Sequence, residues 1–127
     1  MSPDTEKAAK AWKEGARDAF DTAEKLYTSK KYHHALFFCH LAVEKALKAT
    51  YILAHNEMPP YTHHLVFLAS KVDTKLIEEQ KANLPEINTF NIEARYDEEK
   101  LKLYKKATQS YAQEWMAHTS DILKTLL

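Results

Sequence analysis

The sequence predicts an all-α protein, an antiparallel up-and-down bundle of four or five helices. Its 127 residues include one glycine and four prolines, too few for the many turns of an all-β chain. Three long segments repeat apolar residues every three or four positions, as amphipathic helices do. Short connections between such helices favour antiparallel neighbours. At this length we expect residues 1–127 to form one domain.

The first helix is expected over residues 4–27. Ser2 or Asp4 can cap it, and Pro3 suits its first turn. One face carries apolar residues at helical spacing, namely Trp12, Ala16, Ala19, Phe20, Ala23, Leu26 and Tyr27. The connection that follows is short, so the second helix, over residues 31–55, should run antiparallel to the first.

The second helix is apolar on almost every side, which is typical of a helix buried on more than one face. His40, Glu44 and Lys48 nevertheless recur every four residues and form one polar stripe, with Lys45 beside it. Because buried charges are costly unless paired, these groups either neutralise one another or line a wet pocket. We predict that Glu44 is ionised and that Lys48 or Arg95 is its main partner.

Apolar side chains of this helix point in several directions, at Leu36, Phe37, Phe38, Leu41, Val43 and Leu47. A small bundle with three long helices cannot cover every direction. An uncovered apolar strip marks an interface, so we predict a homodimer.

The chain between the second and last helices is less regular. Residues 56–61 contain tandem prolines and should form a loop, after which Thr62 can cap a short helix. The apolar positions of that helix are Leu65, Leu68 and Ala69. A further short helix is expected over residues 74–82, and Pro85 should break the chain again.

Residues 85–96 give an ambiguous pattern, which fits one helical turn and a loop. Asp97 can cap a last helix that runs to the C-terminus, with acids in its first turn, where the helix dipole favours them. Its apolar stripe is Leu101, Tyr104, Thr108, Tyr111, Trp115, His118 and Ile122. Lysines on the first part of this helix stand beside acids and are expected to form a solvated face.

Composition excludes several classes of function. Eighteen basic and eighteen acidic residues give a formal net charge of zero, so no bulk attraction to nucleic acid or anionic membranes is expected. A single cysteine, Cys39, excludes an intrachain disulfide. The N-terminus lacks the apolar segment of a signal peptide, and no apolar run approaches the ~20 residues that span a bilayer. We expect a cytoplasmic protein that makes no membrane contact.

No motif indicates a metal or another cofactor. Seven histidines are present, but their spacing matches no known zinc or di-iron pattern. The lone Gly15 excludes a glycine-rich phosphate loop, so side chains alone would have to hold any phosphate.

Three short motifs resemble those of the HEPN domain family. They are Ala-Val-Glu-Lys-Ala-Leu-Lys-Ala at residues 42–49, Thr-His-His-Leu at residues 62–65, and Ala-Arg-Tyr at residues 94–96. Their order and spacing match over nearly the whole chain. The resemblance implies a prokaryotic helical bundle that commonly dimerises, often with a small nucleotidyltransferase partner in a toxin–antitoxin pair. Relatives include metal-independent ribonucleases, proposed nucleotide binders and non-catalytic partners.

The resemblance also implies where a site would lie. Matching motif positions transfer Glu44, Lys45 and Lys48 from the second helix, Thr62 and His63 from the short helix, and Arg95 and Tyr96 from the last motif. We expect the ligand-binding residues to be Glu44, Lys45, Lys48, His63, Arg95 and Tyr96. Cations, a histidine and a flat aromatic ring suit an anionic ligand, most simply a phosphate.

The chain departs from the ribonuclease branch, in which an arginine is followed, four to six polar positions later, by a histidine. No histidine follows Arg95 in that range. We therefore expect a binding and interaction module for nucleotides or a protein partner, and assign no catalytic residue. The alternative is a ribonuclease toxin with a displaced site, in which His63 meets Arg95 across the fold. Two structural alternatives are a bundle with no ligand, and an Arg95–Glu44 ion pair that serves stability.

Overall fold

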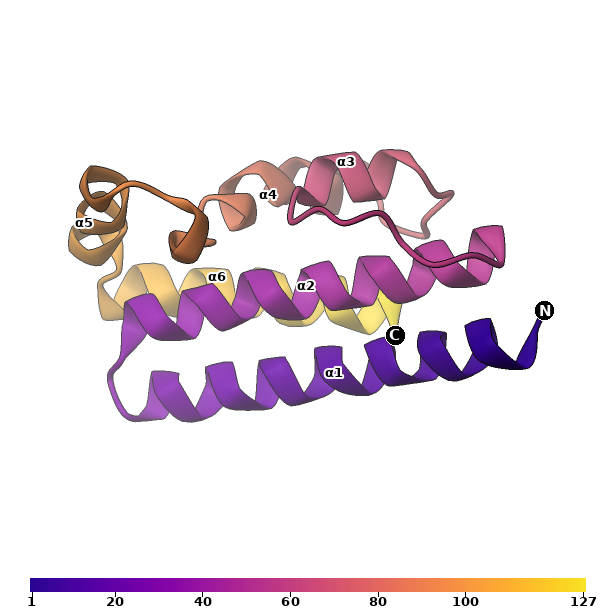
Figure 1. The fold of residues 1–127 in the computed structure, drawn as a ribbon. Helices are drawn as coiled ribbons and strands as arrows, with labels where there is room; N and C mark the ends of the chain where they lie inside the picture. The colour runs from indigo at the N-terminus through magenta and orange to yellow at the C-terminus, as the bar shows by residue number, and fades with distance from the viewer.

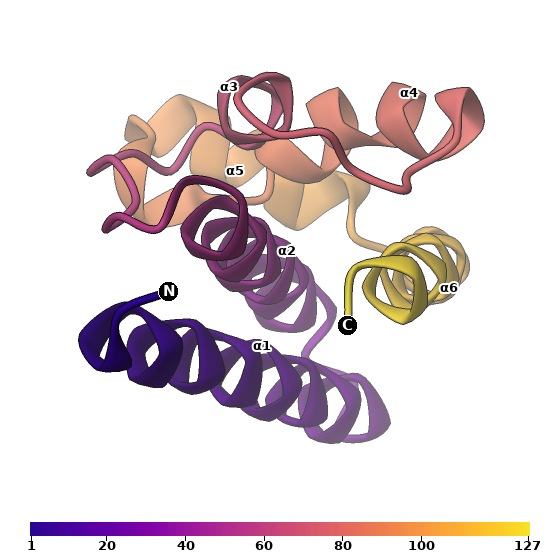
Figure 2. The same cartoon turned by 90° about the vertical axis from the view of Figure 1, so that its right-hand side faces the viewer.

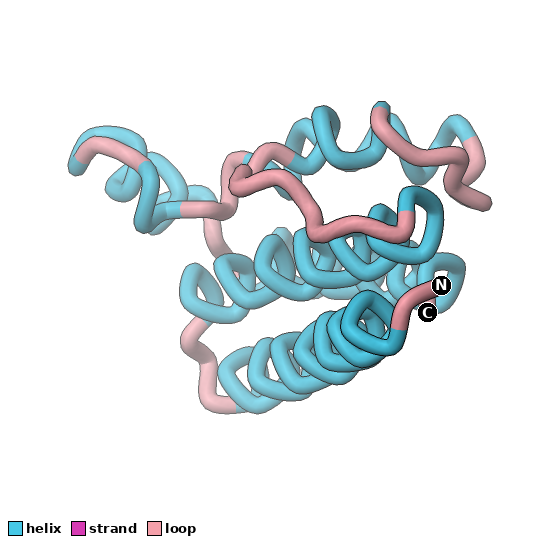
Figure 3. The backbone as a smooth tube through the Cα atoms, turned by 45° about the vertical axis from the view of Figure 1, so that its right-hand side comes forward, coloured by secondary structure: helices cyan, strands magenta, loops and turns pink.

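Helices make up almost the whole of the computed structural model, which describes the backbone of all 127 residues and every side chain except that of Ala94. The described backbone contains no strand (Figure 3). The predicted all-α class is confirmed. The α-helices are α1 (Pro3–Thr28), α2 (Tyr32–His55), α3 (Leu65–Ser70), α4 (Glu78–Asn88), α5 (Asp97–Lys106) and α6 (Gln109–Leu126), with a 3-10 turn, η1 (Ile92–Ala94), before α5.

Helix α2 is the centre of the bundle. It runs antiparallel to α1, with α6 alongside and α3 and α4 across the opposite side from α1 (Figures 1 and 2). Both helices bury small side chains completely, among them Ala16 and Ala23 of α1 and Ala42 and Ala46 of α2. Small side chains let two helix backbones approach closely, and α1 and α2 make the most extensive contact of any helix pair described.

The first residue of α1 and the last residue of α2 are set by short-range hydrogen bonds and backbone conformation. Ser2 caps α1, because its Oγ accepts a hydrogen bond from the Thr5 N–H at 3.2 Å. At the C-terminal end of α2, Asn56 takes a left-handed conformation (φ 52°), which ends the helix. The Asn56 side chain also accepts a hydrogen bond from the Thr5 hydroxyl at 2.5 Å, which ties the two outer ends of the hairpin together.

The expected cap of α3 was wrong by two residues. Helix α3 begins at Leu65, and the ring of His64 caps it, with Nδ1 accepting from the Phe67 N–H at 3.2 Å. Thr62 instead accepts a hydrogen bond from the His64 N–H at 3.1 Å and forms the turn before the helix.

The expected break at Pro85 was also wrong, because α4 continues through this residue to Asn88. Pro85 lies on the exposed side, whereas Leu84 and Ile87 are buried in the core. Burial of such side chains contributes about 1.5–3 kcal/mol each, which offsets the hydrogen bond that proline removes.

The expected single last helix is two helices. Thr108 caps α6 by accepting from the Tyr111 N–H at 3.2 Å, so α5 ends at Lys106 and turns aside from the bundle (Figure 1). Tyr96, rather than Asp97, occupies the N-cap position of α5. Within α5 only Leu103 is buried, so little apolar contact holds this helix in line with α6.

The exposed apolar residues lie elsewhere than expected. On α2, Leu36, Val43 and Leu47 are fully buried, and Phe37, Phe38 and Leu41 are partly buried. Large exposed apolar residues lie instead in the last turn of α2, in the segment that follows it and on α5, at Leu53, Met58, Tyr61, Val66, Phe67, Leu101 and Tyr104. Among the described residues, no helix has the length and apolarity needed to cross a membrane.

Candidate functional site

Glu44 is the centre of a polar cluster inside the bundle, with a side chain that is 4% exposed. Lys48 donates from Nζ to Glu44 Oε2 at 3.0 Å, as predicted from their spacing. His63 donates from Nδ1 to Glu44 Oε1, also at 3.0 Å. The predicted pairing of Glu44 with Lys48 is confirmed, whereas the contacts of Arg95 described below are to other groups. The carboxylate is thus held from both sides.

Lys48 lies on the side of the cluster that is buried against α1. Its ammonium is buried and lies 5.2 Å from the centre of the Trp12 ring on α1, a cation–π contact. Lys45 points elsewhere: a Cβ added to Gly15 of α1 would lie 3.2 Å from Lys45 Cδ, so this side chain covers Gly15. Adjacent residues of a helix are rotated by about 100°, which explains why Lys45 and Glu44 face different neighbours.

His40 completes the stripe and is neutral. Burial lowers the pKa of this histidine, and its hydrogen bond to the His63 backbone and the nearby Glu44 only partly oppose that effect. Since His40 Nε2 lies 3.0 Å from the His63 carbonyl oxygen, Nε2 carries the proton and Nδ1 is an acceptor. That buried Nδ1 has no hydrogen-bond partner in the described part of the chain.

On the side of the cluster that faces solvent, half of the His63 side chain is exposed in a cleft with a volume of about 240 Å³. We call it the histidine cleft; its lining residues are Thr62, His63, His64, Asn88, Asn91 and Arg95. Asn88 helps to shape it, since its Oδ1 accepts from the Leu65 N–H at 2.8 Å and joins the end of α4 to the start of α3. His63 and Arg95, distant in sequence, therefore face one cleft.

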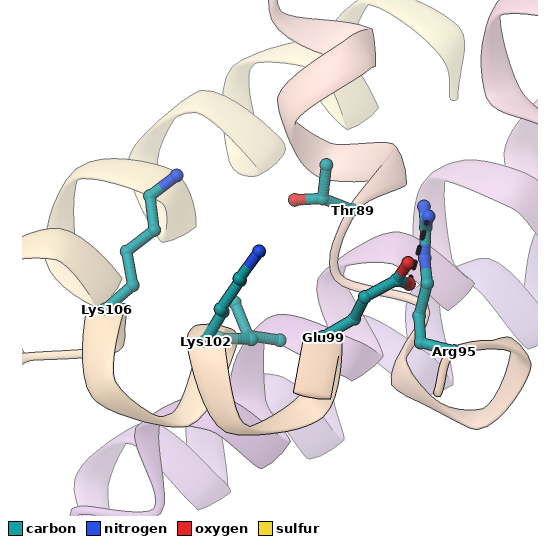
Figure 4. Close-up of a pocket in the computed structure, with 6 residues that line it drawn as sticks. Thr89, Arg95, Glu99, Lys102 and Lys106 are labelled. Atoms are coloured by element: carbon teal, nitrogen blue, oxygen red, sulfur yellow. Dashed lines mark ion pairs between the residues drawn. The ribbon is translucent and has the colours of Figure 1, made fainter. Parts of the chain in front are cut away.

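Arg95 is also part of a second hollow, the basic groove, shown in Figure 4. This groove is about 240 Å³ and is lined by Thr89, Arg95, Glu99, Lys102, Leu103 and Lys106. Glu99 turns toward Arg95, with Nη1 and Oε2 3.6 Å apart, and Arg95 Nη2 donates to the Asn88 carbonyl at 3.2 Å. Lys102 and Lys106 extend from α5 beside them (Figure 4).

Lys106 is anchored more firmly than Lys102. Its ammonium lies 2.6 Å from Glu86 Oε2, and the Tyr111 hydroxyl donates to the same carboxylate. Burial raises the pKa of Glu86, but the two hydrogen bonds and the charge of Lys106 together outweigh it and lower the pKa overall. Burial and then this hydrogen bond raise the pKa of Tyr111, which stays a neutral donor. Lys102 makes no ion pair within the described residues, so its charge is available.

A third hollow of about 250 Å³ opens beside α2, and we call it the α2 hollow. Its lining residues are Phe37, His40, Leu41, Glu44, His63, Asn91 and Glu93. It shares His63 and Asn91 with the histidine cleft, and the cleft shares Arg95 with the basic groove. The three hollows therefore follow one another across the molecule.

The six expected ligand-binding residues separate into two groups. Glu44, His63 and Arg95 line the hollows, and Lys48 stands behind Glu44. Lys45 and the 85% exposed Tyr96 line none of the hollows described above. Sequence analysis missed Asn88 at the end of α4, and Asn91 and Glu93 between α4 and α5, because residues 85–96 show no clear helical period. Lys102 and Lys106 are exposed, as the expected solvated face requires, and both also line the basic groove.

The cluster is organised for hydrogen bonding rather than for metal coordination. Within the described residues, no group of three or more His, Cys, Asp or Glu side chains has the arrangement needed to hold a metal ion. Cys39 is buried, which raises the pKa of its thiol to about 12 and leaves it unreactive at neutral pH. His63 and Arg95 instead line the histidine cleft, and Lys102 and Lys106 line the basic groove.

Comparisons with known proteins agree with this helical fold. A family model described as the HEPN domain matches residues 9–127. Among solved structures, the crystal structure of TT1696 from Thermus thermophilus is similar, with a TM-score of 0.79 and 21% sequence identity over 93% of this chain and 94% of that one. No curated protein matches the sequence. At this identity, the structural similarity shows the fold alone.

Proposed function

Since the chain belongs to the HEPN domain family, we propose that it binds nucleotides or RNA through a phosphate group held in the histidine cleft. Family membership supports a helical module related to nucleotides or RNA in general. The more specific proposal depends on one observation, the position of Arg95 between the histidine cleft and the basic groove.

The donors of Arg95 are only partly used. A guanidinium carries five N–H groups, whereas the contacts described for Arg95 are one hydrogen bond to Asn88 and a long ion pair with Glu99. Arginine binds phosphate through two parallel hydrogen bonds. A phosphate could therefore replace Glu99 at modest cost, with His63 on one side and Lys102 on the other.

Binding of ATP and of a short single-stranded RNA, measured by calorimetry, tests this proposal. Arg95→Ala should weaken binding about tenfold or more, the scale of a lost charge-assisted contact. Arg17→Ala is the matched control, because Arg17 is the other arginine and is exposed on α1. Equal affinities of the two variants, or no binding by the wild type at millimolar ligand, would overturn the proposal.

We also propose that the protein is a homodimer and acts with a small nucleotidyltransferase as a toxin–antitoxin-type pair. The exposed apolar side chains of Tyr61, Val66 and Phe67 support the dimer, because such patches mark interfaces. Sedimentation at micromolar concentration should give the dimer mass, and a monomer alone would contradict it. Co-purification with the product of a neighbouring nucleotidyltransferase reading frame tests the pair.

The second candidate function is metal-independent ribonuclease activity, and the Glu44–His63 hydrogen bond favours it. Because His63 Nδ1 donates to Glu44, neutral His63 keeps Nε2 as a base in a cleft that also contains Arg95. His63 would take the proton of a ribose 2′-hydroxyl while that oxygen attacks phosphorus. The P–O5′ bond would break, giving a 2′,3′-cyclic phosphate and a 5′-oxygen that takes a proton from water, and His63 would return its proton to the solvent. Arg95 would stabilise the phosphorane charge.

RNA cleavage in the presence of a chelator distinguishes binding from cleavage. If the chain is a ribonuclease, His63→Ala and Arg95→Ala should each abolish cleavage, whereas His34→Ala should leave it intact because His34 is exposed outside the cleft. Intact RNA after prolonged incubation with the wild type, together with measurable binding, would leave the binding module as the function.

A further inference from the structure

We propose that the α2 hollow binds a nucleobase and prefers guanine, an inference that rests on the proposed phosphate site. The hollow adjoins the histidine cleft through His63 and Asn91, so a phosphate beside Arg95 leaves the attached nucleoside within reach of it. The base would enter between α2 and the segment that precedes α5.

The size and walls of the hollow suit a single flat ring system. Its volume of about 250 Å³ is below the range of about 300–1,000 Å³ that drug-sized ligands occupy. Phe37 and Leu41, both partly buried on α2, supply apolar walls. A nucleobase offers apolar faces and a polar edge, which matches apolar walls combined with a polar rim.

The polar groups of the hollow are mostly acceptors. Glu93 is exposed, and no ion pair or hydrogen bond described for the chain uses its carboxylate. Asn91 adds an amide that both donates and accepts. The hollow therefore favours a ligand edge with several N–H groups.

Guanine has such an edge. Its ring N1–H and its 2-amino group are adjacent donors that can both bond one carboxylate, here that of Glu93. Adenine and cytosine place a ring acceptor beside their amino group, and this acceptor would face the carboxylate oxygen unfavourably. A good bidentate pair of this kind discriminates between bases by roughly tenfold or more.

Titration of the full chain with GMP, IMP, AMP and inorganic phosphate tests the inference. GMP should bind about tenfold more tightly than AMP, and IMP should fall between them because it keeps the ring N–H but lacks the 2-amino group. Glu93→Gln should remove most of the preference for GMP and leave phosphate binding unchanged. Glu98→Gln is the matched control, an exposed acid on α5 that lines none of the three hollows.

The outcomes separate the two proposals. Equal affinity for GMP, AMP and phosphate, all lost in Arg95→Ala, would overturn base recognition and leave the phosphate site intact. Glu93→Gln without effect on a measured preference for GMP would also overturn it, because the preference would then arise elsewhere. No binding of any of these ligands at millimolar concentration would overturn both proposals.

Discussion

The α1–α2 hairpin and the segment over residues 56–108 use their polar groups in opposite ways. In the hairpin, alanines pack two long helices together, and Lys48 is enclosed with its partners. In the segment, helices are short and polar side chains such as Asn91, Arg95 and Lys102 face the hollows. The hairpin holds its buried charges in fixed pairs, whereas the segment presents polar groups to solvent, where a ligand can contact them.

Glu44 connects the two regions. One carboxylate oxygen accepts from Lys48 inside the hairpin, and the other accepts from His63, which belongs to the segment. The backbone carbonyl of His63 accepts from His40 of the hairpin as well. The orientation of the His63 ring in its cleft is therefore set by the hairpin, although His63 itself lies in a loop.

Because Glu44 joins the hairpin to the segment, we expect its removal to have the largest effect on stability. Glu44→Ala leaves Lys48 as an unpaired buried charge, which should lower the free energy of unfolding by about 3 kcal/mol. Chemical denaturation measures this change. Asp21→Ala is the control, since the Asp21–Lys25 pair is exposed to solvent and its removal should change stability little. A loss for Glu44→Ala as small as the control's would mean that the hairpin does not depend on this carboxylate.

The second prediction concerns pH. Burial lowers the pKa of His40 in the folded chain below its ordinary value of about 6.5, with Glu44, His63 and Arg95 the charged or titratable groups that act on it. Below pH 6.5 the unfolded chain therefore binds a proton that the folded chain does not. Stability should be complete above this pH and fall by up to about 1.4 kcal/mol per pH unit below it, until the folded histidine also titrates.

Denaturation at pH 7 and pH 5.5 measures this loss. Carboxylates contribute to the same pH dependence, so the useful quantity is the difference between the wild type and His40→Gln, which keeps an N–H donor for the His63 carbonyl. The variant should lose less stability between the two pH values. An identical pH dependence would show that His40 titrates alike in both states.

The hairpin could be predicted from sequence because its signals are local. The Ser2 cap, the apolar period of both helices and the spacing of Glu44 and Lys48 each act within one or two turns. The segment could not, because its structure depends on distant contacts. Helix α4 passes Pro85 because its flanking residues are buried by other elements, and no local pattern measures that burial.

The site residues likewise divide into those that a local sequence motif predicted and those that depend on distant contacts. Glu44 and His63 were expected as members of short motifs, and both line the α2 hollow. Asn91 and Glu93 occupy a stretch with no apolar period, so nothing in the sequence related them to α2. Lys45 was included because it belongs to the same motif, but helix geometry turns it toward α1.

A smaller effect is expected at the boundary between α5 and α6. Thr108→Ala removes the side-chain acceptor that caps α6 and should reduce stability by about 1 kcal/mol, as loss of an N-cap typically does. Thr108→Ser keeps the hydroxyl and should retain most of the stability that the cap provides. Calorimetric unfolding of both variants measures the difference. If the alanine variant matched the serine variant, packing rather than the cap would separate the two helices.

The smallest effect, and one of opposite sign, is expected where Lys45 covers Gly15. Glycine within a helix is less favourable than alanine by about 0.8–1 kcal/mol, so Gly15→Ala should stabilise α1. The new Cβ would lie 3.2 Å from Lys45 Cδ and 3.4 Å from its Nζ, but these are atoms of a long side chain that can shift by a few tenths of an ångström.

We therefore expect a net gain of about 0.5 kcal/mol in Gly15→Ala, measured by chemical denaturation. In a Lys45→Ala background the crowding disappears, and the same substitution should give the full helix-propensity gain. A loss of stability in the first background and a gain in the second would mean that Lys45 is held rigidly over α1. In that case the tight packing of the hairpin would extend to its charged surface, and the polar groups free to exchange partners would be confined to residues 56–108.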